Sequence, residues 1–200
     1  EVADEMRAKG YADAREFERA TILFTDFKGF TAMAEVLSAG DLVKEIDHCF
    51  KAFDAIIDRH GIEKIKTIGD AYMAAGGLPD PANGRPGDVV EAALELQEYM
   101  EEYKKQREAA GLPHFEMRLG MHTGPVVAGI VGVKKYAYDI WGDTVNTASR
   151  MESSGAVGRV NISGDTYALV RDDPRFSFTH RGRVQAKGKG EMDMYFVDRA

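Results

Sequence analysis

The sequence predicts an α+β fold in which helices cover a mainly antiparallel sheet. Two observations lead to this class. Short runs rich in β-branched and aromatic residues alternate with two long stretches of helical periodicity. The strand-like runs also lack the regular strand–helix–strand spacing of a parallel sheet. A ferredoxin-like core with a C-terminal α/β extension satisfies this order within one domain, for which 200 residues with 44% hydrophobic content suffice.

The first half of the chain predicts a strand, a helix and a hairpin. Residues 19–27 (RATILFTDF) have the composition of a strand and end beside a glycine. Residues 62–77 predict a hairpin that reverses at Gly69 and Asp70. Between them, apolar residues recur at helical spacing behind Asp41, the expected N-cap; they are Leu42, Ile46, Phe50, Phe53 and Ile57.

The second half predicts a long helix followed mostly by strands. The helix opens at Pro86, with Asp88 and Glu91 as a capping pair, and ends near Gly111. Residues 115–122 and 125–131 predict paired strands that turn at Thr123 and Gly124. Further strands are expected at 136–141, 159–163, 178–185 and 192–197, with a helix at 144–152. We expect His122 to be structural and Trp141 to lie in the core.

Composition and charge exclude several classes of protein. The formal net charge of −7 argues against a nucleic-acid grip, which needs a basic face. The lone cysteine, Cys49, has no disulfide partner, so we expect a reducing, cytoplasmic compartment. No apolar run approaches the length that spans a bilayer. Residues 1–18 are charge-rich and are interpreted as a linker; the start at Glu1 indicates a fragment of a longer polypeptide.

Asp26 and Asp70 are the first candidates for chemistry. Each lies at the end of a predicted strand, next to a glycine and without a lysine partner in the turn. Carboxylates in this setting suit a hard cation, and two such cations can hold the attacking and leaving oxygens of a phosphoryl transfer. Two turn aspartates alone are also explained as simple turn formers.

Five motifs decide between these interpretations, because they occur together and in one order: FTDFKGFT, IKTIGDAYM, RLGMHTG, YDIWGDTVNTASRM and KGKGEM. On these motifs, residues 17–197 resemble the catalytic domain of class III adenylate and guanylate cyclases. The resemblance implies a palm-type fold over residues 19–200. It also implies a head-to-tail homodimer whose shared active sites lie at the interface.

The resemblance assigns the metal and phosphate sites. Asp26 and Asp70 match the residues that bind two divalent metal ions, Mg²⁺ or Mn²⁺, and the backbone carbonyl of Phe27 matches a further metal ligand. The backbone of residues 28–31 would cradle the phosphates, as N–H groups of glycine-containing turns do; these residues are Lys28, Gly29, Phe30 and Thr31.

The resemblance also assigns cationic and polar groups to the substrate. Arg118 matches an arginine that contacts the terminal phosphates. Asn146 and Arg150 are four residues apart on the predicted helix and so share one face; the first would position the ribose, and the second would stabilise charge on the α-phosphate. Lys187 matches a lysine that reaches the triphosphate from a C-terminal loop, with Lys189 as the alternative if the register slips.

Lys66 and Asp139 match the residues that select the base. Adenylyl members of the family carry this lysine and aspartate, whereas guanylyl members carry glutamate and a small residue such as cysteine. Lys66 and Asp70 are four residues apart on an extended arm, on the order of 13 Å at about 3.3 Å per residue, too far for a mutual ion pair.

The resemblance therefore implies an adenylate cyclase that converts ATP into cyclic AMP and pyrophosphate. The alternatives are a guanylate cyclase and a non-catalytic nucleotide-binding or dimerisation module. No protein general base is identified, so substrate or water would serve. An upstream sensor or regulatory domain is expected in the full-length protein, and a membrane anchor there is left open.

Overall fold

The computed structural model describes residues 14–132 and 135–200 of the chain. Eight strands form its sheet: β1 (Arg15–Lys28), β2 (Glu63–Ile68), β3 (Ala71–Gly76), β4 (Glu116–Val131), β5 (Ala137–Trp141), β6 (Val160–Ser163), β7 (Phe176–Ala186) and β8 (Gly190–Arg199). The helices among these residues are α2 (Phe30–Val36), α3 (Ala39–Arg59), α4 (Pro86–Ala109), α5 (Asp143–Ser153) and α6 (Gly164–Val170).

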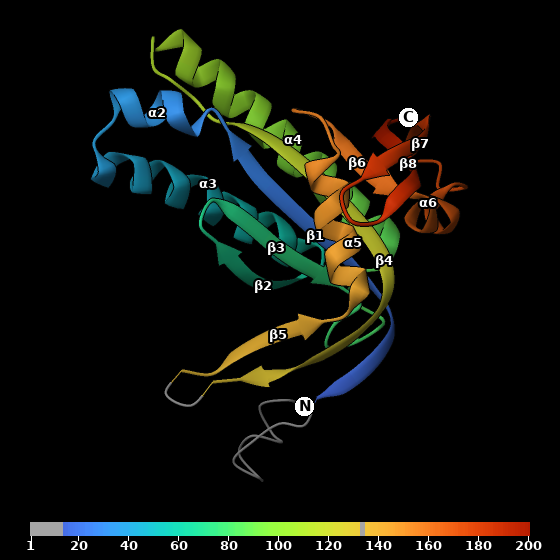
Figure 1. Ribbon diagram of the computed structural model, residues 1–200. Helices are drawn as coiled ribbons and strands as arrows, with labels where there is room; N and C mark the ends of the chain where they lie inside the picture. The colour runs from blue at the N-terminus through green and yellow to red at the C-terminus, as the bar shows by residue number, and fades with distance from the viewer. Residues whose placement is uncertain (1–13, 133–134) are drawn as a thin grey trace.

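The strand order confirms a mainly antiparallel sheet. It runs β2-β3-β1-β4-β6-β8-β7, and β5 pairs with the outer part of β4. Only the pairing of β4 with β6 is parallel within the described strands. The chain therefore has the predicted α+β fold, with β1 at the centre of the first half and α5, β6, α6, β7 and β8 as the C-terminal extension (Figure 1).

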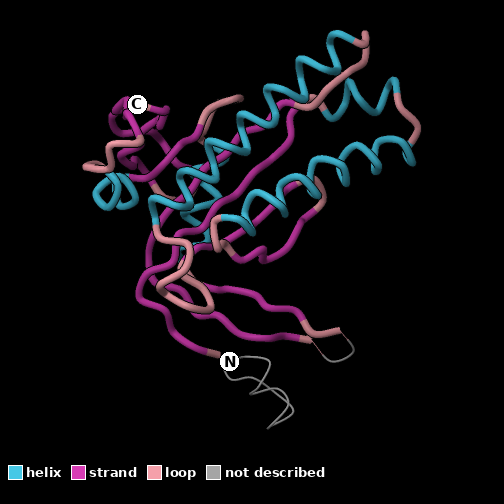
Figure 2. The backbone as a smooth tube through the Cα atoms, turned by 180° about the vertical axis from the view of Figure 1, so that it is seen from behind, coloured by secondary structure: helices cyan, strands magenta, loops and turns pink. Residues whose placement is uncertain are grey.

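The two larger apolar clusters of the described residues lie on opposite faces of the sheet. On one face, Leu23 and Phe27 of β1 pack under α3 and α4, which run side by side in both views (Figures 1 and 2). On the other face, Ile22 and Phe24 form a second cluster that includes Ala148 of α5. Side chains alternate along a strand, so Asp26 belongs to the face that α5 covers.

The region around Thr123 and Gly124 differs from the prediction. We expected a turn there, but β4 is one strand of 16 residues that pairs with β1 on both sides of this point. The hydroxyl groups of Thr123 and Thr21 hydrogen-bond at 3.0 Å across the pair. Gly124 serves packing, because a Cβ there would lie 2.6 Å from the Oγ1 of Thr144. The prediction of paired strands was therefore wrong.

Helix starts also differ from the prediction. Ser38, not Asp41, caps α3, since its Oγ accepts the N–H of Asp41 at 3.1 Å. At α4 the Asp88 carboxylate accepts the backbone N–H of Arg85 at 3.2 Å. Glu91 instead pairs with Arg199 at 2.7 Å. The prediction thus placed each helix start within about one turn of its observed position, but it did not identify the residue at the N-cap.

Other elements extend or correct the sequence analysis. β1 begins at Arg15, within the stretch interpreted as a linker, most of which lies outside the described residues. The short helix α6 was not predicted. Trp141 is 42% exposed, so its expected core position was wrong. His122 is buried within β4, with Nδ1 2.6 Å from the Oγ of Ser163, as expected of a structural residue, although no turn is present there.

Candidate functional site

Asp26 and Asp70 come together at the end of the central hairpin. Asp26 lies near the end of β1 and is paired with Ala71, so the β2–β3 turn brings Asp70 beside it. Burial, and then the negative charge of Asp26, raise the pKa of the Asp70 carboxyl above its ordinary value. The Nζ of Lys28 lies 3.1 Å from Asp26, so the expectation that Asp26 has no lysine partner was wrong. The negative charge of Asp26 still acts on Asp70, and a cation bound between the two carboxylates would relieve this repulsion.

The donors at this spot suit a hard divalent metal ion. Within the described residues no group of three or more His, Cys, Asp or Glu side chains could hold a metal by itself. Two carboxylates together with a backbone carbonyl leave coordination positions open, as is typical of Mg²⁺ sites completed by substrate phosphates. The chemistry of the donors therefore fits the two metal ions that the sequence predicted.

The segment after Asp26 forms a turn with free amide groups. The Phe27 side chain stacks on Phe115 at 4.7 Å between ring centroids and is buried, which fixes the end of β1. Gly29 has φ +87°, a left-handed conformation that favours glycine, and α2 starts at the next residue. The N–H of Met33 donates to the Gly29 carbonyl at 3.1 Å. The preceding N–H groups have no partner within the helix and can bind an anion.

Arg118 faces Asp26 from the neighbouring strand. The two residues are paired between β1 and β4, and Arg118 Nη2 lies 3.8 Å from an Asp26 carboxylate oxygen. Its Nε donates to Glu152 of α5 at 3.0 Å. Sequence analysis missed Glu152, and no local spacing could have revealed it, because the contact joins residues 34 positions apart.

Lys66 and Asp139 form an ion pair between β2 and β5. The Lys66 Nζ lies 2.9 Å from Asp139 Oδ2, while Asp139 Oδ1 accepts the backbone N–H of Ile140 at 2.8 Å. Asp139 is mostly buried and Lys66 is partly exposed. The fold thus brings together two predicted base-selecting residues that are 73 positions apart in sequence.

Asn146 and Arg150 lie on α5, away from its packed side. Helix α5 buries Thr144, Thr147, Ala148 and Met151, whereas Asn146 is exposed and Arg150 half-buried. Within residues 14–132 and 135–200, no hydrogen bond or ion pair links either side chain to Asp26 or Asp70. The side chains of Asn146 and Arg150 therefore make no direct contact with the two aspartates within the described part of one chain.

The two lysines of the β7–β8 turn differ in their surroundings. Lys189 Nζ forms an ion pair with Asp143 at the start of α5. Lys187 is exposed and makes no ion pair with another described residue. Lys187 is therefore the one that can reach a bound anion without first breaking a contact.

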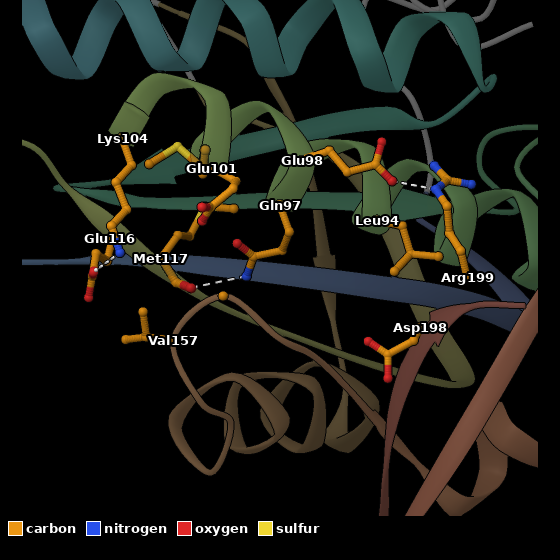
Figure 3. A pocket seen from close by; sticks show the side chains of 12 residues that line it. Leu94, Gln97, Glu98, Glu101, Lys104, Glu116, Met117, Val157, Asp198 and Arg199 are labelled. Atoms are coloured by element: carbon orange, nitrogen blue, oxygen red, sulfur yellow. Dashed lines mark hydrogen bonds and ion pairs between the residues drawn. The ribbon is translucent and has the colours of Figure 1, made fainter. Parts of the chain in front are cut away.

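A cavity of about 370 Å³ lies elsewhere, beside α4 (Figure 3). Leu94, Gln97 and Lys104 of α4 line one side, and Glu116 and Met117 of β4 lie across from them. Figure 3 shows the Gln97 amide donating to the Met117 carbonyl, at 3.0 Å. None of the predicted site residues lines this cavity.

Comparisons with known proteins identify the family of the chain. Residues 12–199 match the model of a family described as adenylate and guanylate cyclase catalytic domain. The chain belongs to this family. The match covers the whole sheet and every predicted site residue.

Relatives of both nucleotide specificities are similar to this cyclase domain. An adenylate cyclase of Mycobacterium tuberculosis is 40% identical over 92% of the chain and 40% of the relative. Human guanylyl cyclase C is 38% identical over 98% of the chain and 18% of the relative. The chain thus spans less than half the length of these relatives.

A solved structure is similar over the whole domain. The guanylate cyclase domain of RhGC from Catenaria anguillulae, in complex with GTP, has a TM-score of 0.84 and 34% identity, covering 92% of this chain and 98% of that one. Cyclase domains of this family bind a nucleotide, use divalent metals and work as dimers. In the part of the chain that the structure describes, no helix is both long and apolar enough to cross a membrane.

Proposed function

We propose that this cyclase domain is an adenylate cyclase, which converts ATP into cyclic AMP and pyrophosphate at the interface of a homodimer. The observation that carries the choice of ATP is the Lys66–Asp139 pair, with its cationic donor 2.9 Å from its anionic acceptor. Adenine presents a matching edge, on which the N1 acceptor and the N6 donor are neighbours. Guanine presents the inverse pattern, an N1–H donor beside the O6 acceptor.

Both oxygens of Asp139 already accept a hydrogen bond within the chain, Oδ1 from the N–H of Ile140 and Oδ2 from the Lys66 ammonium. A carboxylate oxygen can accept a second hydrogen bond, so the Asp139 carboxylate, held in place by these contacts, can also accept one from an adenine amino group. Guanine would place its O6 against this carboxylate, and a buried acceptor without a donor is costly. The pair therefore favours ATP over GTP for two reasons. It forms hydrogen bonds with adenine, and it is left without matching partners when guanine binds.

The metal ions, when bound, would lower the pKa of the ribose 3′-hydroxyl and neutralise the triphosphate. Asp26, Asp70 and the Phe27 carbonyl would hold them. The free N–H groups at the start of α2 would bind the phosphates, and Arg118 would contact the terminal ones.

The ribose 3′-oxygen then attacks the α-phosphorus in line, and pyrophosphate leaves. Asn146 orients the ribose, while Arg150 and Lys187 stabilise the negative charge that develops on the phosphates. Positioning and charge neutralisation supply the rate, without a covalent intermediate. Substrate or water takes the proton of the 3′-hydroxyl.

A head-to-tail homodimer completes each site. The metal-binding group of one chain would meet Lys66, Asp139, Asn146, Arg150 and Lys187 of its partner. Within the described part of one chain, Asn146 and Arg150 make no hydrogen bond or ion pair with Asp26 or Asp70, and the dimer would supply them to the site from the partner. We place the domain in the cytoplasm, where its single cysteine, Cys49, stays reduced, and its regulation in an upstream domain of the full-length protein.

The test is product identity from the purified dimer, given ATP or GTP with Mg²⁺ or Mn²⁺. The proposal expects cyclic AMP and a higher kcat/KM for ATP. Cyclic GMP as the main product would establish the guanylate alternative, which is the activity named for the human relative, guanylyl cyclase C. Nucleotide binding without any product would establish a non-catalytic module.

A further inference from the structure

Glu152 is a carboxylate that the proposed mechanism leaves without a role, although it lies beside groups that have one. Its side chain is only 13% exposed, on the side of α5 that faces the sheet. Its Oε2 accepts the Nε–H of Arg118 at 3.0 Å. A buried carboxylate is costly unless it is paired, so this contact explains why Glu152 can be buried.

The contact determines how the Arg118 guanidinium is oriented. A guanidinium is planar, with Nε on one edge and the two Nη nitrogens at its end. Glu152 holds the Nε edge, and Nη2 points toward Asp26, at 3.8 Å. The end of the plane therefore faces the proposed metal and phosphate site, and a rotation of the plane would break the bond to Glu152.

Gly120 brings Glu152 within reach of Arg118. The two residues of β4, two apart, lie on the same face of the strand. A Cβ at Gly120 would lie 2.1 Å from the backbone nitrogen of Glu152, so α5 contacts the strand directly at this point. With any larger residue, α5 would have to move away and the Glu152–Arg118 distance would grow.

The end of α5 that carries Glu152 is also anchored from the C-terminal extension. The Asn161 side chain is fully buried and donates to the carbonyl of Met151 at 2.9 Å. Arg181 donates to the carbonyl of Ser154 at 2.8 Å. The backbone is therefore anchored both before and after Glu152. A side chain that orients another group must itself be fixed in this way.

We propose that Glu152 is a positioning residue, which holds the Nε edge of Arg118 so that its Nη nitrogens bind the terminal phosphates of the substrate. This inference rests on the proposed function. Glu152 itself does not touch the nucleotide. Its effect passes through Arg118 and concerns the polyphosphate, which leaves as pyrophosphate.

Inhibition by inorganic pyrophosphate measures this directly in the homodimer. Glu152→Ala is expected to weaken pyrophosphate inhibition and raise the KM for ATP by about tenfold or more, as misplacement of a binding group does. Glu152→Gln keeps an oxygen for the Nε–H and should restore most of the affinity. In an Arg118→Ala background, Glu152→Ala should add little, because the two residues act as one unit. Additive losses in the double variant would overturn the proposal.

Glu45 provides a matched control. It is a partly buried carboxylate, 23% exposed, that pairs with Arg107 at 3.4 Å and contacts none of the predicted site residues. Glu45→Ala should change the melting temperature of the domain but not the pyrophosphate inhibition constant. An equal loss of inhibition in the Glu45 and Glu152 variants would mean that Glu152 acts only through stability.

A mixed dimer with one intact site separates positioning from a general structural role. The first chain carries Arg150→Ala and supplies Asp26 and Arg118 to the intact site. The second chain carries Asp26→Ala and supplies Arg150 to the same site. Glu152→Ala should lower kcat/KM about tenfold in the first chain and have little effect in the second. Equal losses in both placements would overturn the proposal. If the mixed dimer is inactive before Glu152 is changed, the shared-site function fails, and pyrophosphate inhibition of the homodimer still decides the role of Glu152.

Discussion

Exchange of Lys66 for glutamate together with Asp139 for cysteine is expected to move the preference of the domain from ATP toward GTP. The glutamate can accept the N1–H of guanine, and the thiol removes the carboxylate that repels O6. Neither change suffices alone. Lys66→Glu would place a second carboxylate against Asp139, whose Oδ2 now lies 2.9 Å from the Lys66 ammonium. Asp139→Cys would leave Lys66 facing the N1–H of guanine, a donor against a donor.

The structure sets the size of the effect. The Asp139 side chain is 15% exposed, so a guanine oxygen against it meets a mostly desolvated acceptor. Such a mispaired group costs about 1 to 3 kcal/mol, roughly a 5- to 150-fold effect on kcat/KM. Lys66 is 45% exposed, and solvent screening places its contribution at the low end of this range. Asp139 should therefore carry most of the discrimination.

The assay is the ratio of kcat/KM for ATP and GTP in the parent, both single variants and the double variant, with dimerisation verified in each. Lys64→Glu is a matched control, because it makes the same charge change on β2 at a residue that pairs with Asp54 instead, at 2.9 Å. That variant should keep the parental ratio. A parent that prefers GTP, or a double variant that keeps the parental ratio, would refute the assignment of Lys66 and Asp139 to the base.

Three further predictions follow from the structure. Asp26→Ala or Asp70→Ala should abolish turnover while the domain stays folded, and metal-dependent activity in either variant would count against the metal site. Burial lowers the pKa of His122 below its ordinary value of 6.5. The unfolded chain therefore takes up this proton at a higher pH than the folded one. The stabilising contribution is full above about pH 6.5 and is lost as pH falls below it, so the melting temperature should fall less steeply between about pH 7 and pH 5 in His122→Gln. Gly124→Ala should lower the free energy of unfolding by about 1 to 3 kcal/mol, because its Cβ would lie 2.6 Å from a side-chain oxygen of α5. Gly40→Ala, whose Cβ would meet no atom within 4 Å, should instead raise it slightly in denaturant titrations.

The sequence by itself determined the fold class, the family and the residues that carry the proposed chemistry. Local patterns were sufficient where the signal is local. The hairpin with Asp70 at its turn follows from strand composition around Gly69, and α5 follows from periodicity behind Gly142. The proposed site residues could be assigned because each belongs to a short motif that can be recognised without knowing its spatial neighbours.

Only the tertiary structure decided which of these residues meet. Lys66 and Asp139 form an ion pair although they are 73 positions apart, and Glu152 accepts a hydrogen bond from Arg118 across 34 positions. No sequence periodicity encodes such contacts. Gly124 is a second case in which the sequence alone did not reveal a long-range contact. A glycine beside a threonine predicts a turn when only its neighbours in sequence are considered, yet here it lets α5 approach an unbroken strand. The role of a glycine depends on what packs against it, and that partner is brought into place only when the chain folds.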